Sequence, residues 1–280
     1  MRITGRFAFW ALVLMVMAVG VANAQNCSTT ITACGCTIAS AGTYAVANDL
    51  NASQGLTSRG SCIDINTTNV KLFTNGFNII GAGTGTGTGI HVLNTANNAL
   101  LEASGPEAQY TYTTLSGWQY GLESEADNVM IDAYYFDGNT TGVWLRNAAN
   151  NHLTYFDASG NTTYGAWIRG GSGNSIDNAY LGNNGVAGLY VGCSTTGPTG
   201  TRCTGFGNTS SGNFISFAGS EAGGPPQSYG IALESGSTGN TVADTAFVGN
   251  TADDFWDGST TAVNVWRVNS FTTANRSYIH

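Results

Sequence analysis

A phrase of about 22 to 24 residues recurs along this chain and constrains its fold more than any other feature. Each copy opens on a glycine followed by alternating apolar residues, and reaches an asparagine before a second apolar stretch. Repeats of this length with Gly and Asn corners are typical of a solenoid. No copy holds a helical 3.6-residue period, so we expect an all-β solenoid. The clearest copies open at Gly121, Gly142, Gly165, Gly188 and Gly230.

Two positions of the phrase predict the core. Alternate residues of a strand point to opposite faces, so the residue after each opening glycine and the residue two further on should face inward. The first predicted inward row is Leu122, Val143, Ala166, Leu189 and Ile231. The second is Ser124, Leu145, Ile168, Val191 and Leu233.

Asparagines and glycines mark the corners. Stacked asparagine amides can bond from coil to coil, and we expect such a ladder before the second strand of each coil. Gly-Asn pairs at 138–139, 160–161 and 249–250 mark a further turn, which gives three strands per coil. The expected ladder is Asn128, Asn150, Asn174, Asn213, Asn240 and Asn264.

The composition fits a folded solenoid. Charged residues make up 9% of the chain and hydrophobic residues 42%. Disorder requires the reverse, low hydrophobicity with high charge. The 39 glycines are explained by the many tight corners.

The first 24 residues have the pattern of a secretory signal peptide. Arg2 and Arg6 precede an apolar run at 7–21, and Ala22-Asn23-Ala24 is a small-residue cleavage pattern. The run has about 15 residues, whereas a membrane span takes about 20. We therefore expect export with cleavage before Gln25, and a secreted or cell-surface protein that is not integral in the membrane.

Charge limits the partners of the mature chain. Cleavage removes two of nine basic residues and none of the 17 acidic ones, which leaves seven minus 17, a net charge of −10. Nucleic-acid binding relies on clustered Lys and Arg, and Lys71 is the only lysine. We therefore expect no nucleic-acid partner, and acidic polysaccharides are disfavoured.

Six cysteines in an exported chain predict disulfides. The four in the N-terminal region allow three pairings. Two of them lie 26 residues apart, close to one coil, which would bring their Cα atoms to disulfide distance. A metal site is the weaker alternative, because Cys34-Gly35-Cys36 lacks the Cys-x2-Cys spacing of zinc sites. The preferred pairs are Cys36–Cys62, Cys27–Cys34 and, around a turn-rich segment, Cys193–Cys203.

The N-terminal coils carry a family resemblance. Cys36-Thr37-Ile38, Gly42-Thr43-Tyr44, Cys62-Ile63-Asp64-Ile65 and 76–81 (Gly-Phe-Asn-Ile-Ile-Gly) resemble the opening coils of exported bacterial right-handed parallel β-helix proteins of the pectin-lyase-like superfamily. The resemblance covers nearly all of the mature chain and implies that fold. It implies no single activity, since the superfamily includes polysaccharide lyases, galacturonases, epimerases, tailspikes and proteins without known activity.

The catalytic motifs of those relatives are mostly missing. Polygalacturonase-like enzymes carry Asn-Thr-Asp, Asp-Asp, Gly-His-Gly and Arg-Ile-Lys, of which only Asp253-Asp254 is present. The Asp-Pro-His-Asp of alginate epimerases is absent. The segment 253–257 is better interpreted as a terminal turn, and the well-known enzyme classes are disfavoured.

An aromatic strip is the leading candidate binding site. Between the inward rows, Glu123, Trp144, Trp167, Tyr190 and Ala232 should face outward at the strand spacing of about 4.8 Å. Trp144, Trp167 and Tyr190, assisted by Arg146 and Arg169, would suit sugar rings. Alternatively, the rings lie beneath loops or simply reinforce the sheet by stacking on one another.

A second cluster could be catalytic. If Ile131 and its equivalents face inward, Asp132 and Asp177 share an outward column with His152 in the next. Two carboxyls about two coils apart approach the spacing of inverting glycosidases, roughly 6.5 to 9.5 Å. The alternative is a set of solvated polar residues, and calcium at the two aspartates is a weaker possibility.

These observations predict a signal peptide at 1–24, an N-terminal cap with disulfides at 25–59, and a right-handed parallel β-helix of about ten coils at 60–280. We expect a non-catalytic protein that binds polysaccharide at the cell surface or in the matrix, with no cofactor. A polysaccharide hydrolase or lyase using Asp132, His152 and Asp177 is the alternative, and a purely structural surface protein is the second. The sequence leaves the oligomeric state open.

Overall fold

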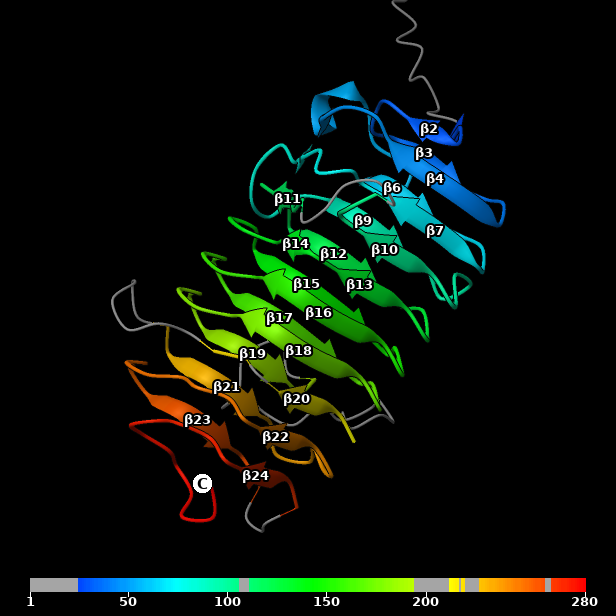
Figure 1. Ribbon diagram of the computed structural model, residues 1–280. Coiled ribbons are helices and arrows are strands. Elements are labelled where there is room, and N and C mark those ends of the chain that lie inside the picture. The colour runs from blue at the N-terminus through cyan, green and yellow to red at the C-terminus, as the bar shows by residue number, and fades with distance from the viewer. Residues whose placement is uncertain (1–24, 106–110, 194–211, 217, 220–226, 260–262) are drawn as a thin grey trace, which may run out of the picture.

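The chain winds into a stack of coils in which equivalent strands of successive coils pair in parallel (Figure 1). The computed structural model describes residues 25–105, 111–193, 212–216, 218–219, 227–259 and 263–280. Among these, the only helical segment is a single 3-10 turn, η1 (Ala52–Gln54), so the all-β prediction is confirmed. The predicted signal peptide lies outside the described residues. No helix in the described part of the chain is both long and apolar enough to cross a membrane.

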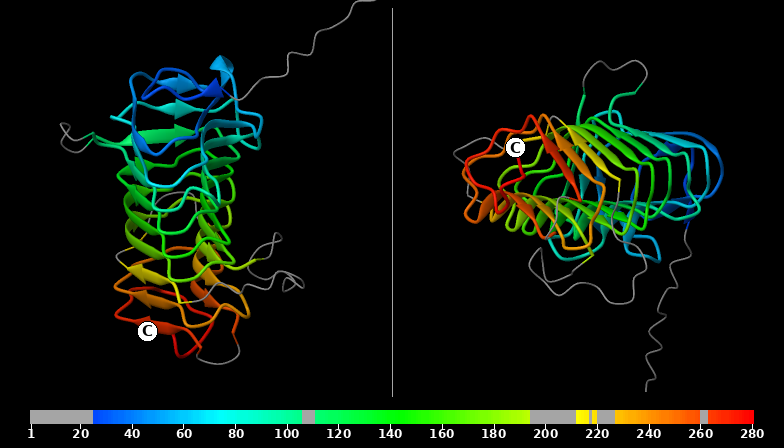
Figure 2. Two further views of the ribbon diagram at one scale, coloured as in Figure 1. Left: turned by 90° about the vertical axis from the view of Figure 1, so that its right-hand side faces the viewer. Right: turned by 90° about the horizontal axis from the view of Figure 1, so that it is seen from below.

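The described strands form two long parallel sheets on two sides of the stack (Figure 2). Sheet 1 has ten strands: β1 (Gln25–Asn26), β3 (Cys36–Ile38), β6 (Ser61–Ile65), β9 (Thr88–Val92), β12 (Tyr120–Ser124), β15 (Thr141–Arg146), β17 (Tyr164–Arg169), β19 (Ala187–Val191), β21 (Tyr229–Leu233) and β23 (Asp253–Asp257). Sheet 2 has fourteen, of which ten are β2 (Thr30–Ile31), β4 (Gly42–Val46), β7 (Val70–Phe73), β10 (Leu100–Glu102), β13 (Met130–Asp132), β16 (His152–Asp157), β18 (Ser175–Tyr180), β20 (Phe214–Ser216), β22 (Thr241–Ala243) and β24 (Val265–Arg267).

The remaining four strands of sheet 2 form a third side in the first half of the stack. They are β5 (Leu50–Asn51), β8 (Ile79–Ile80), β11 (Thr113–Ser116) and β14 (Tyr134–Tyr135). In β16 and β18 this side is continuous with the second strand of the coil, and beyond them it is marked by isolated bridges at Gly219, Ala246 and Ser270. Each of these two strands bends at one residue with positive φ: Tyr155 in β16, at 49°, and Asn178 in β18, at 50°. The expected three strands per coil therefore hold for the first coils, and two of the three fuse in the coils of β16 and β18.

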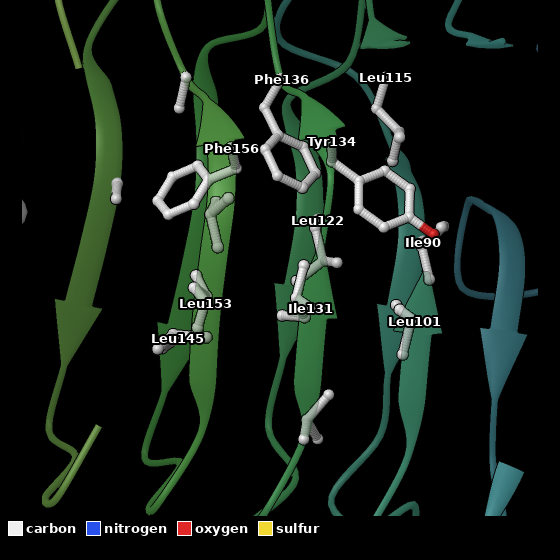
Figure 3. Packing of buried hydrophobic residues seen from close by; sticks show 14 of the residues in the cluster. Ile90, Leu101, Leu115, Leu122, Ile131, Tyr134, Phe136, Leu145, Leu153 and Phe156 are labelled. Atoms are coloured by element: carbon white, nitrogen blue, oxygen red, sulfur yellow. The ribbon is translucent and has the colours of Figure 1, made fainter. Parts of the chain in front are cut away.

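Both predicted inward rows are confirmed. All ten residues are buried, and the ladder pairs them in the expected register, for example Leu122 with Val143 and Val143 with Ala166. Apolar side chains from sheet 2 and the third side meet them across the interior, and the rings of Tyr134, Phe136 and Phe156 lie among them (Figure 3). Burial of such side chains contributes about 1.5 to 3 kcal/mol each.

The glycine that opens each phrase is fixed by a close approach of backbones. A Cβ at Gly142 would lie 2.6 Å from the carbonyl oxygen of Gly165 and 3.1 Å from Asn161 Nδ2. A Cβ at Gly165 would meet the oxygen of Gly188 at 2.7 Å. Any side chain at this column would therefore push successive coils apart, which explains the periodicity of glycine.

The asparagine ladder exists, but Asn128 and Asn150 are not members of it. They adopt positive φ, 59° and 56°, at the corner itself. The ladder position is the next residue, which is Val129 in the first of these coils and Asn151 in the second, and Asn151 Oδ1 accepts a bond of 2.7 Å from Val129 N. In each rung a side-chain oxygen accepts from the backbone N–H of the coil before it, and the ladder consists of Asn151, Asn174, Asn213, Asn240 and Asn264.

A second amide ladder lies on the other side of the glycine column. Asn139 N donates to Asn161 Oδ1 at 3.0 Å, and Asn161 N donates to Asn184 Oδ1 at the same distance. Asn184 N then donates to Gln227 Oε1 at 3.1 Å. All four side chains are buried. The Gly-Asn pairs at 138–139 and 160–161 are thus correctly assigned to turns, and their asparagines point inward.

The preferred pairing of the N-terminal cysteines is wrong. The disulfides join Cys27 to Cys36 and Cys34 to Cys62, with Cα separations of 4.9 and 4.3 Å. Cys36 lies opposite Ile63 in the ladder, so the side chains of Cys36 and Cys62 point to opposite faces of the sheet. The expected Cys193–Cys203 pair lies outside the described residues, because Cys203 is not among them.

Candidate binding face on sheet 1

One column of side chains runs along the outer face of sheet 1 and changes character halfway. Strand pairing places its members opposite one another in consecutive coils. We call this the central outer column. Its members are Thr37, Asp64, His91, Glu123, Trp144, Trp167, Tyr190, Ala232 and Trp256.

The second half of the column is aromatic, in the predicted register. The ring centroids of Trp144 and Trp167 lie 5.2 Å apart with planes 15° from parallel, and those of Trp167 and Tyr190 lie 6.0 Å apart. Tyr120 packs on the far side of Trp144 at 4.5 Å, and Tyr164 lies 5.1 Å from Tyr190. Stacking of like on like, one of the alternatives raised above, therefore occurs.

The expectation that these rings form an exposed strip is wrong. Trp144 and Trp167 are 7% and 6% exposed, and Tyr190 is fully buried. With Tyr164, Ala187 and Ala232 they form a second apolar cluster, separate from the interior core, which we call the outer aromatic cluster. Because each ring face is covered by the next ring, a sugar could not stack on an indole face without separating the coils.

Two arginines lie above the rings. The guanidinium carbon of Arg146 is 5.1 Å from the Trp144 ring centre, and that of Arg169 is 5.5 Å from Trp167. Such cation–π contacts contribute about 0.5 to 1 kcal/mol at exposed sites. Trp167 Nε1 donates to the Gly192 carbonyl at 2.8 Å, whereas Trp144 Nε1 has no partner among the described residues.

The first half of the column is charged. His91 Nδ1 faces Asp64 Oδ1 at 3.7 Å, and His91 Nε2 faces Glu123 Oε1 at 4.0 Å and Glu125 Oε1 at 3.9 Å. Arg146 Nη2 lies 2.9 Å from Glu123 Oε1 and also contacts Glu125 Oε1. We call this group, completed by Arg59, whose Nη1 is 3.6 Å from Asp64 Oδ2, the charged cluster.

Burial makes the charged cluster unusual. The side chain of Asp64 is fully buried and that of His91 is 10% exposed. Neither oxygen of Asp64 nor Nε2 of His91 has a hydrogen-bond partner in the described part of the chain. An unsatisfied buried polar group costs about 1 to 3 kcal/mol, and more when charged. Each such group in a native protein therefore calls for an explanation, of which a bound ion is one.

Burial also perturbs the titration of the cluster. Loss of solvation lowers the pKa of His91 to about 4, against the opposing attraction of Asp64. Burial raises the pKa of Glu123, although Arg146 opposes the shift. A neutral imidazole and a carboxyl that holds its proton more tightly therefore lie side by side. Groups perturbed in this way on a shared surface are candidates for a functional site.

The predicted cluster on sheet 2 has the expected register. Asp132, Thr154 and Asp177 pair across β13, β16 and β18, and His152 lies in the neighbouring column. His152 is exposed. Burial raises the pKa of Asp132, an effect that His152 opposes. Asp177 accepts bonds from Ser216 Oγ at 2.6 Å and Asn178 Nδ2 at 3.2 Å, so its carboxylate is already engaged.

The Asp253-Asp254 pair belongs to a strand, β23, and the interpretation as a terminal turn is wrong. Asp254 is fully buried. Burial alone would raise its pKa, but hydrogen bonds from Asn250 and from the N–H groups of Thr272 and Thr273 lower it below the usual value. Its carboxylate therefore ties the last coil to the segment that follows.

Asp64 and His91 were not among the site residues predicted from the sequence. The repeated phrase was read from Gly121 onward, yet Gly89-Ile90-His91-Val92 has the same opening, and Ile63-Asp64-Ile65 has the same alternation without the glycine. Extending the phrase two coils toward the N-terminus would have placed both side chains in the column of Glu123. The expectation of no metal did not foresee one group of potential ligands, since oxygens of Glu123 and Glu125 and a nitrogen of His91 lie within 4.8 Å of one another.

The fold defines a right-handed parallel β-helix, as the resemblance implied. The chain belongs to the family described as "right handed beta helix region", which matches residues 75–247. A comparison with curated protein sequences finds no match.

Solved structures share the fold at low sequence identity. The Dettilon tailspike protein superposes with a TM-score of 0.57 at 14% identity, over 85% of this chain and 47% of its own. The chain thus spans about half the length of that tailspike. An alginate lyase from Paenibacillus gives 0.49 at 12% identity, over 90% and 91% of the two chains. The A-module of an Azotobacter vinelandii mannuronan C-5 epimerase gives 0.40 at 13% identity, over 87% and 90%.

Proposed function

We propose that the protein binds polysaccharide with the outer face of sheet 1, centred on the boundary between Glu123 and Trp144. One observation carries the proposal: buried polar atoms without hydrogen bonds line up along the central outer column. They are both oxygens of Asp64, Nε2 of His91 and Nε1 of Trp144. A row of sugar hydroxyls can donate to the carboxylate and accept from the indole, so a glycan would satisfy these atoms together.

The approach to these atoms lies between flexible side chains. The side chains of Arg59 and Arg146 are 47% and 37% exposed, and each contacts an acid of the cluster. Long arginine side chains can change rotamer at little cost compared with backbone movement. Displacement of the two guanidinium groups by hydroxyls would open the column, while Trp167 and Tyr190 stay packed and hold the strands in place.

Charge favours a neutral glycan. The net charge of −10 expected after signal cleavage repels polyanions, and the charged cluster has three carboxylates against two arginines. The names of two neighbours, a lyase for alginate and an epimerase for mannuronan, include polysaccharides. Their similarity to this chain extends to the fold alone, so the proposal depends on the column.

The test is retention of the mature protein in native gels cast with a panel of neutral and acidic polysaccharides. We expect retardation by a neutral polymer, and at least a tenfold loss of affinity, about 1.4 kcal/mol, in Asp64→Asn, which keeps the shape of the side chain. Tyr155→Ala is the matched control, since Tyr155 is 57% exposed on sheet 2. Equal retention of wild type and Asp64→Asn would reject the face, as would loss in Tyr155→Ala alone.

The second candidate function is polysaccharide cleavage, favoured by the raised pKa of Glu123 in the same column as the buried Asp64, with His91 between them. A carboxyl with a raised pKa can act as a general acid and a second carboxylate as base or nucleophile. The same samples should be assayed for new reducing or unsaturated ends. Release that is lost in Glu123→Gln would establish cleavage at this face; release lost only in the double variant Asp132→Asn, Asp177→Asn would place it at sheet 2.

A further inference from the structure

The charged cluster contains a donor set for a metal ion. His91 Nε2 lies 4.0 Å from Glu123 Oε1 and 3.9 Å from Glu125 Oε1, and the donor atoms of all three residues lie within 4.8 Å of one another. Zinc binds imidazole nitrogen at about 2.0 to 2.1 Å and carboxylate oxygen at about 2.0 to 2.2 Å. An ion between a nitrogen and an oxygen donor joins atoms at most about 4.3 Å apart. Both His91–glutamate separations are shorter than this, and rotamer adjustment of the glutamates would bring the whole set, now within 4.8 Å, onto one ion.

The surroundings of His91 distinguish this group from a chance gathering of acids. Nε2 has no hydrogen-bond partner in the described part of the chain although the side chain is nine-tenths buried. Nδ1, the other ring nitrogen, faces Asp64 Oδ1 at 3.7 Å, and the Asp64 side chain is fully buried with neither oxygen hydrogen-bonded. A carboxylate behind the free nitrogen of a metal-binding histidine is the usual second layer of such sites, because it fixes the ring and strengthens the ligand.

We propose that His91, Glu123 and Glu125 bind a divalent transition-metal ion of the zinc class, and that Asp64 is a positioning residue for His91. The donor types select the ion. Calcium and magnesium prefer all-oxygen sites, and the nitrogen ligand disfavours both. One imidazole with two carboxylates suits zinc and cobalt, and leaves a fourth position for water or another oxygen ligand.

Arg146 is the competitor for this site. Its guanidinium contacts both glutamates and neutralises them in the structure described. It also lies 5.1 Å from the centre of the Trp144 ring. A metal ion would take over the neutralising role, and the arginine could remain over the indole. Zinc binding and the Arg146–glutamate ion pairs are therefore alternatives, which predicts that removal of the arginine tightens zinc binding.

The test uses chelator-treated mature protein and needs no glycan. Zn²⁺ is titrated by calorimetry, and Co²⁺ is added separately to follow its visible absorption, which reports the ligand geometry. We expect one ion per chain. His91→Gln and Glu123→Gln should weaken binding at least about 100-fold, Asp64→Asn should weaken it about 10- to 100-fold, and Arg146→Met should strengthen it.

His152→Ala is the matched control, because His152 is exposed on sheet 2 and far from this donor set in the strand order. Circular dichroism of each variant separates a lost site from a lost fold. Absence of stoichiometric binding in both wild type and Arg146→Met overturns the proposal, as does binding that survives His91→Gln or is lost in His152→Ala. Because the readout is metal alone, failure here leaves the proposed glycan binding standing, and the reverse.

Discussion

The two halves of the central outer column occupy equivalent strand positions but differ in how their buried side chains are satisfied. From Trp144 to Tyr190, every ring is covered by its neighbours and contributes packing. From Asp64 to Glu123, charged groups are buried just as deeply but leave polar atoms without partners. The backbone geometry is the same in both, so the difference comes from side chains alone. The packed rings of the aromatic half stabilise the stack, whereas the unsatisfied buried atoms of the charged half reduce its stability.

The sharpest way to break this comparison is truncation of a buried ring. Trp167→Ala would leave a cavity in the outer aromatic cluster and remove the bond to the Gly192 carbonyl. We expect a loss of about 3 to 5 kcal/mol in the free energy of unfolding, measured by denaturant titration. Tyr155→Ala, at an exposed position, should cost less than about 0.5 kcal/mol. A small effect of Trp167→Ala would mean that the aromatic half does not hold the coils together.

The asparagine ladder lies in the coils from Trp144 onward, and reaches the charged half only through the bond from Val129 N to Asn151 Oδ1. Asn174→Ala removes the acceptor of the Asn151 N–H and the amide that donates to Ala148 O and to Asn213 Oδ1. We expect a loss of about 2 to 4 kcal/mol, from three hydrogen bonds of about 1 kcal/mol each and the donor left buried. The measurement is the same titration, combined with glycan retention. A fully folded variant that had lost only binding would contradict a purely structural role for the ladder.

In the charged half, a substitution at a buried position should raise the unfolding free energy, the opposite of its effect in the aromatic half. Asp64→Asn removes a buried charge that has no hydrogen bond. In the absence of metal and glycan, we expect the unfolding free energy to rise by about 1 to 2 kcal/mol, while ligand binding falls. A stabilised variant with weakened binding would support the comparison directly. A destabilised one would show that the ion pairs with Arg59 and His91 outweigh the burial cost.

The smallest expected effect concerns a carboxylate outside both halves. Burial raises the pKa of Asp157, on the third side of the stack, from 3.8 to about 6. The folded state then holds this proton more tightly than the unfolded state, so its contribution to stability is greatest below about pH 4 and is lost as the pH rises through 6. Asp157→Asn should therefore raise stability above pH 6, by less than about 1 kcal/mol after solvent screening. Thermal melts at pH 4 and pH 7 check the sign, and equal shifts at both would refute it.

Much of the fold could be predicted because each coil of a β-solenoid needs the same residue types at the same positions. The inward rows follow from alternation, and the register follows from the Gly column, since any Cβ there would collide with the next coil. Features whose position shifts by a single residue were predicted wrongly. Cys36 pairs with Ile63 and not with Cys62, and the shift reverses which side chains can meet. The same one-residue shift misplaced Asn128 and Asn150 in the ladder.

The candidate site was harder to predict, for two physical reasons. Strand alternation identifies which side chains leave the core, but Trp144 and Trp167 leave it and are still buried. Exposure depends on what covers a face, and the repeat does not encode that. The charged cluster, in turn, brings together residues from four coils, 59 to 64, 91, 123 to 125 and 146. Their relation appears only after each coil is placed in register.

The second amide ladder has a consequence for the choice of production host. Asn139 and Asn161 each open an Asn-Thr-Thr triplet, which is an acceptor for N-linked glycosylation in eukaryotic secretion. Their side chains are 0% and 2% exposed and carry the hydrogen bonds that join consecutive coils. A sugar attached before folding would have no room in either position. Secretion from yeast or mammalian cells should therefore yield misfolded protein unless the third residue of each triplet is replaced, whereas export from a bacterium avoids the modification.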